Sequence, residues 1–102
     1  DDNKLQHAKY DVEDLIKAIK KIQNQDVATA RLLLYTKCKD LLEFWFDIQQ
    51  EWIPAPKQLF SEVKEKDTKL FQLADSFYSE TDVTLQTQKL KQIVEYIFKD
   101  IS

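Results

Sequence analysis

Apolar residues recur at helical spacing along most of the chain, with polar residues between them. Polar or proline-containing stretches interrupt this pattern, and no segment alternates as a half-buried strand would. We therefore predict five helices, three long and two short, over residues 3–23, 27–50, 57–65, 69–78 and 83–100. The expected fold is an all-α, up-and-down helical bundle that forms a single domain over residues 1–102.

The interruptions contain residues that favour the beginnings and ends of helices. Asp26, Asp67 and Asp82 each precede an apolar-periodic segment, so we expect them to be N-caps. Pro56 fits the first position of a short helix, because its missing N–H would have no helical partner there. Asn24 is a candidate for a left-handed cap at the end of the first helix.

The segment 27–50 is the longest predicted helix, and its side chains divide into distinct faces. At about 100° per residue, six apolar side chains fall within a sector of about 80°, which predicts a core stripe. The stripe consists of Leu34, Cys38, Leu41, Trp45, Ile48 and Trp52. An acidic ridge on another side consists of Asp40, Glu43, Asp47 and Glu51. Arg31, Tyr35 and Gln49 flank the apolar sector on the side away from this ridge.

Composition narrows the possible functions mainly by exclusion. The chain has no glycine, where average usage would give about seven, so it lacks P-loop and dinucleotide-binding motifs. A net charge of −3 disfavours nucleic acid as a partner. No apolar run approaches the roughly 18 residues of a membrane helix. One cysteine, Cys38, allows no internal disulfide and fits a cytoplasmic protein.

Few residues indicate chemistry. His7 is the only histidine and has no cluster of ligands at metal-binding spacing, so we expect no metal site. The acidic ridge is ordinarily a solvated helix face. Alternatively, one of its four carboxylates acts as a general base when a partner domain closes over it.

Two aromatic residues and one lysine are further candidates for binding. Trp45 and Trp52 fall on the same stripe, which favours core packing, and a stacking platform for a ligand is the alternative. Lys57 begins a helix, where acidic side chains suit the helix dipole better. We therefore consider Lys57 a candidate functional cation.

The stretch "LLEFWFDIQQEWIPAPKQLFSEVKEKD" resembles the helical domain that follows the catalytic domain in bacterial nucleotidyltransferases of the kanamycin and lincosamide nucleotidyltransferase type. An aromatic-rich helix is followed there by an amide-containing turn, an aromatic residue, proline and a lysine. Gln49, Trp52, Pro54, Pro56 and Lys57 stand in that order here. The resemblance covers about residues 27–101.

The resemblance implies a substrate-binding helical domain that is not catalytic alone. The catalytic Gly-Ser pair and the Asp-x-Asp motif of that superfamily are both missing. By this resemblance, the chain is a fragment or subunit of a larger protein. Its partner would be a catalytic domain in cis or in trans, which would bring Mg²⁺ and the nucleotide, and the ligand of the helical domain would be a small molecule. By the same resemblance, Glu43, Asp47 or Glu51 would supply the general base, and Trp52 and Lys57 would lie at the cleft edge. Gln49, Arg31 and Tyr35 would be further substrate contacts.

A function from a different class fits the same residues. The chain is then a free-standing helical protein–protein interaction module. A homodimer through the apolar surfaces of the second and last predicted helices is one form of this alternative. The enzymatic role of the chain is left open at this point.

Overall fold

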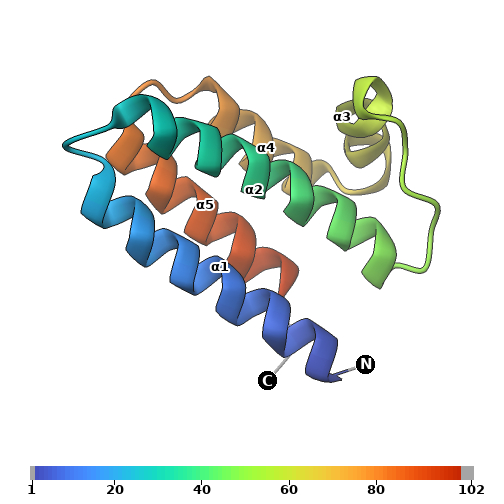
Figure 1. Ribbon diagram of the computed structural model, residues 1–102. Helices are drawn as coiled ribbons and strands as arrows, with labels where there is room; N and C mark the ends of the chain where they lie inside the picture. Colours follow the sequence, from blue (N-terminus) through green and yellow to red (C-terminus); the bar gives the residue numbers. More distant parts are fainter. Residues whose placement is uncertain (1, 100–102) are drawn as a thin grey trace.

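Five helices account for most of the described residues, 2–99, in this computed structural model (Figure 1). They are α1 (Asp2–Ile22), α2 (Val27–Ile48), α3 (Pro56–Lys66), α4 (Thr68–Ser79) and α5 (Val83–Ile97). No strand occurs in residues 2–99. The prediction of an all-α fold of five helices is confirmed, although Asp100, the predicted last residue of the fifth helix, lies outside the described residues.

The four longer helices run in alternating directions, and α3 lies across one end of the bundle (Figure 1). Helix α5 contacts α1, α2 and α4, while α3 contacts α4 and α2. The core between them is apolar. Its largest fully buried hydrophobic side chains are Phe46, Phe77, Ile19, Leu34, Leu42, Leu70, Leu90 and Ile93. Each such side chain contributes about 1.5–3 kcal/mol when it leaves water, so burial along α2, α4 and α5 fixes the bundle.

The predicted aspartate caps are confirmed. Asp26, Asp67 and Asp82 each accept a hydrogen bond of 3.0 Å from the backbone N–H three residues later. Asp67 also ends α3, because its own N–H donates to the carbonyl of Val63 at 2.8 Å. One residue therefore connects two helices. Pro56 begins α3, as predicted.

The end of α2 differs from the prediction. The helix ends at Ile48, and Gln50 has a φ of 59°, the one positive φ among the described residues. The N–H groups of Gln50 and Glu51 donate to the carbonyls of Asp47 and Phe46, both at 3.0 Å. This is a Schellman motif with glutamine at the position that usually holds glycine. The predicted left-handed residue, Asn24, does not have a positive φ.

This ending removes Trp52 from the core stripe. Leu34, Cys38, Leu41 and Trp45 are buried as predicted, but Trp52 is 96% exposed. The prediction of core packing for Trp52 is wrong, because the left-handed turn at Gln50 breaks the helical register before Trp52 is reached. The extended conformation required before Pro54 also keeps the helix from resuming.

Candidate functional site

Residues 49–57 form an exposed corner between α2 and α3, which we call the proline corner. Trp52 is 96% exposed and its neighbour Ile53 is 50% exposed. Neither residue takes part in a hydrogen bond within the described part of the chain. The Schellman motif fixes the corner at one end and Pro56 at the other. An ion pair of 2.7 Å between Glu51 and Lys66 attaches it to α3. The corner thus presents two large apolar side chains on a restrained backbone.

Three of the sequence-predicted binding residues belong to this corner. Gln49 is the C-cap of α2, Trp52 lies in the extended segment, and Lys57 is in the first turn of α3. All three are exposed. Sequence analysis missed Ile53 as a fourth member. The proline that follows Ile53 already placed it outside the predicted helix of residues 27–50, but no signal in the sequence indicated that its side chain is exposed.

Arg31 and Tyr35 lie elsewhere. Along α2, Arg31 is about 27 Å from Gln49 at 1.5 Å per residue. Its guanidinium donates a hydrogen bond to the carbonyl of Thr81. The ring of Tyr35 stacks on Tyr78 of α4 with centroids 5.6 Å apart, and the Tyr78 hydroxyl donates to the Tyr35 carbonyl at 3.0 Å. The five predicted substrate-binding residues therefore do not surround one space.

The acidic ridge is divided among separate ion pairs. Glu43 pairs with Lys39 of the same helix at 2.9 Å, and Asp47 pairs with Lys4 of α1 at 2.7 Å. Glu51 lies beyond the end of α2, where it pairs with Lys66 of α3. Glu43, Asp47 and Glu51 thus each have a different lysine as counter-ion. Their proposed role as a general base stays a prediction.

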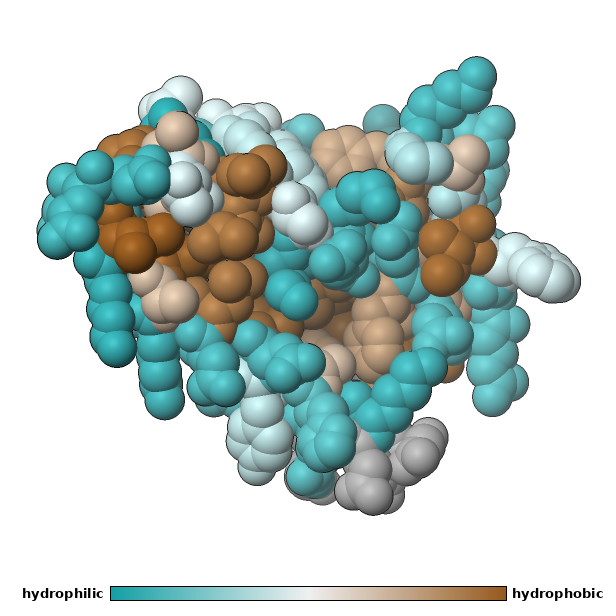
Figure 2. Space-filling model, in the orientation of Figure 1, coloured by the Kyte–Doolittle hydropathy of each residue, from teal (hydrophilic) through white to brown (hydrophobic). Residues whose placement is uncertain are grey.

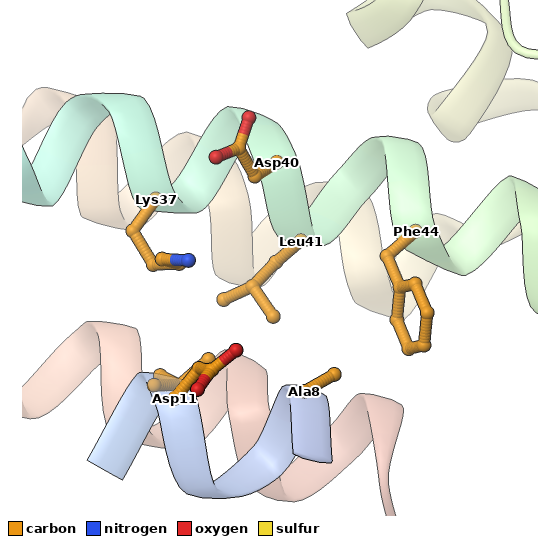
Figure 3. Close-up of a pocket in the computed structure, with 7 residues that line it drawn as sticks. Ala8, Asp11, Lys37, Asp40, Leu41 and Phe44 are labelled. Atoms are coloured by element: carbon orange, nitrogen blue, oxygen red, sulfur yellow. The ribbon is translucent and has the colours of Figure 1, made fainter. Parts of the chain in front are cut away.

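A shallow groove runs between α1 and α2 (Figure 3). One pocket of about 160 Å³ has Ala8, Leu41 and Phe44 along it, with Asp11 and Lys37 at its rim. An adjoining pocket of about 170 Å³ shares Phe44 and continues toward Ile48. Figure 2 shows apolar surface bordered by polar side chains on this face. Both pockets are smaller than the 300–1,000 Å³ typical of small-molecule sites.

The described residues contain no cluster of histidine, cysteine and carboxylate side chains that could hold a metal ion. His7 is exposed and Cys38 is buried. Burial raises the pKa of the Cys38 thiol to about 12, although the neighbouring Tyr78 partly opposes this. Because the thiolate is the nucleophilic form, Cys38 is not reactive at neutral pH.

Residues 2–99 include no helix with both the length and the apolar character needed to cross a membrane. The chain matches no known family model, and comparisons with curated protein sequences and with solved structures find no similar protein.

Proposed function

We propose that this chain is a helical protein-interaction domain that docks through the proline corner. The observation that carries the proposal is the 96% exposure of Trp52 beside the half-exposed Ile53. Tryptophan is among the residues most enriched at interaction hot spots, where it fills an apolar pocket of the partner. Trp52 contributes nothing to the core of this fold, so its apolar surface would leave water only when a partner covers it.

The restrained backbone of the corner supports this proposal. A docking segment that is already ordered loses little conformational entropy when it binds. The Schellman motif, two prolines and the Glu51–Lys66 ion pair supply that order here. Lys57 places an exposed positive charge at the α3 end of the same segment. We therefore expect a partner whose surface has an apolar pocket with a carboxylate at its rim.

A second function is favoured by the shared exposure of Gln49, Trp52 and Lys57 at one corner. This is the arrangement required of a cleft rim by the resemblance to helical domains of nucleotidyltransferases. In that case the partner is a catalytic nucleotidyltransferase domain, in cis or in trans. The catalytic domain would bring the nucleotide and Mg²⁺, and the corner would contact a small-molecule substrate.

The first experiment identifies the partner and then measures its affinity. A photo-crosslinking amino acid at position 52 captures neighbouring proteins in the native cell, and binding is then measured with the purified partner. We expect Trp52→Ala to weaken binding about 30-fold, as a hot spot of about 2 kcal/mol predicts. The free energy of unfolding of the Trp52→Ala variant should differ from that of the wild type by less than about 0.5 kcal/mol, because Trp52 is exposed.

Leu32→Ala is the matched control, since Leu32 is 64% exposed but lies on α2 far from the corner. An equal loss of affinity for both variants would contradict docking through the corner. A captured domain with Gly-Ser and Asp-x-Asp motifs would favour the transferase role, and transfer by the complex would then be assayed. Capture of a second copy would instead favour the homodimer.

A further inference from the structure

A second, larger groove lies between α1 and α5, away from the proline corner. Its volume is about 440 Å³, within the range typical of small-molecule sites. Ile16 and Val94 form its apolar floor, and both side chains are 6% exposed. Lys9, Lys17 and Lys20 of α1 and Lys91 of α5 line it as well. An apolar floor with several cationic side chains is a surface suited to an anion that carries an apolar group.

Positive charge is in excess along this groove. Four lysines line it against two carboxylates, Glu13 and Glu95. Within the described part of the chain, none of the four lysines forms an ion pair with a carboxylate. The excess of positive charge is local, since the whole chain has a net charge of −3.

Lys20 of α1 and Lys91 of α5 both line the groove, so they bring positive charge to it from two helices. The Lys20 ammonium group lowers the pKa of Lys91, and partial burial lowers it further, while Glu95 opposes both effects. Two ammonium groups held together repel each other unless an anion lies between them. A bound anion would reduce the repulsion between these two ammonium groups.

We infer that the α1–α5 groove binds a small organic phosphate. The phosphate would lie between Lys20 and Lys91, with Lys17 nearby, and the apolar body of the ligand would lie on Ile16 and Val94. Lysine binds phosphate as a point charge and does not require the planar geometry of arginine. The site is independent of the proline corner and of the partner proposed there.

The test is a titration of the ¹⁵N-labelled chain with phenyl phosphate, followed by amide chemical shifts. We expect saturable shifts for residues along the groove, and weaker binding of inorganic phosphate and of phenol. Lys20→Gln and Lys91→Gln should each weaken binding about three- to fivefold, as the loss of one partly exposed charge contact predicts. Lys69→Gln is the matched control, because Lys69 is an exposed lysine on α4.

Thermal unfolding without ligand provides a second readout. Lys91→Gln should raise the melting temperature by about 1–3 °C, because it removes a like-charge contact, whereas Lys69→Gln should leave it unchanged. Absence of saturable shifts at the groove, or equal weakening by Lys69→Gln, would overturn the assignment. Binding to phosphatidic acid vesicles without binding to phenyl phosphate would overturn it as well, since the source of phosphate would then be a membrane.

Discussion

Gln50 is the residue whose backbone determines the shape of the candidate site. Its φ of 59° lies in the left-handed region, where a side chain costs about 1 kcal/mol relative to glycine. The chain contains no glycine that could take this position. The left-handed conformation of Gln50 turns the following residues away from the helix, and this turn places Trp52 in solvent.

We therefore expect Gln50→Gly to raise the free energy of unfolding by about 0.5–1 kcal/mol, measured by urea denaturation. Gln49→Gly is the control, because Gln49 has an ordinary helical φ of −76°. Glycine at that position relieves no strain and should lower stability by a similar amount. A destabilising effect of Gln50→Gly would show that the glutamine side chain is required at the corner.

Cys38 and Tyr78 form the most strongly perturbed titratable pair in the described structure. Burial raises the pKa of both groups, and that of the Cys38 thiol reaches about 12. An exposed thiol titrates near 9.0. Since the unfolded chain loses its thiol proton first, the contribution of Cys38 to stability is complete below pH 9 and is lost as the pH rises toward 12.

The corresponding experiment compares the wild type with Cys38→Ala at several pH values. Between pH 7 and pH 10, the free energy of unfolding of the wild type should fall by about 1 kcal/mol more than that of the variant. Native Cys38 should also react with a thiol reagent only as fast as the protein opens. Rapid labelling of the native protein at pH 8 would contradict the buried, protonated thiol.

At the scale of elements, Asp67 connects α3, α4 and α5. It ends α3, caps α4, and accepts hydrogen bonds from the Tyr96 hydroxyl at 2.7 and 2.9 Å. The bond to Asp67 and partial burial raise the pKa of Tyr96. One carboxylate therefore serves both the local cap and the attachment of α5.

Asp67→Ala should cost about 2 kcal/mol of stability, since it removes both the cap and the bond to Tyr96. Tyr96→Phe, which leaves the cap in place, should cost about 1 kcal/mol. In the double variant the two losses should not add, which a thermodynamic cycle would measure. Simple additivity would show that Tyr96 stabilises α5 independently of Asp67.

Helix positions could be predicted from the sequence because their signals are local. An aspartate before an apolar-periodic segment is sufficient to predict a cap, as Asp26 and Asp82 show. The exposure of Trp52 could not be predicted in the same way, because it depends on a left-handed glutamine with no sequence signal. The α1–α5 groove depends on the packing of segments about 70 residues apart, which periodicity within one helix does not specify.

At the scale of the whole molecule, two polar residues of the described chain, Gln86 and Thr87, are buried beside the apolar core. Gln86 is fully buried, and its amide nitrogen lies 3.4 Å from both the Phe77 carbonyl and the Tyr35 hydroxyl. Its side-chain oxygen has no hydrogen-bond partner among the described residues. A buried acceptor without a partner lowers stability, so Gln86 joins α5 to α2 and α4 at an energetic cost.

We expect Gln86→Leu to raise the free energy of unfolding by about 1 kcal/mol, because leucine keeps the volume without the polar group. Gln86→Ala should instead lower it by about 2 kcal/mol through the cavity left behind. Chemical denaturation of both variants measures the difference. A loss of stability in Gln86→Leu would mean that the two long hydrogen bonds contribute more than desolvation costs.

The first turn of α1 and the last turn of α5 lie at the same end of the bundle (Figure 1). The packing of the helices does not depend on the order in which they are joined, so the chain can be circularly permuted. A linker between the present ends, with new ends opened between Trp52 and Ile53, should leave far-UV circular dichroism unchanged. Because the same cut divides the proline corner, this permutant should fold but should no longer bind through the corner.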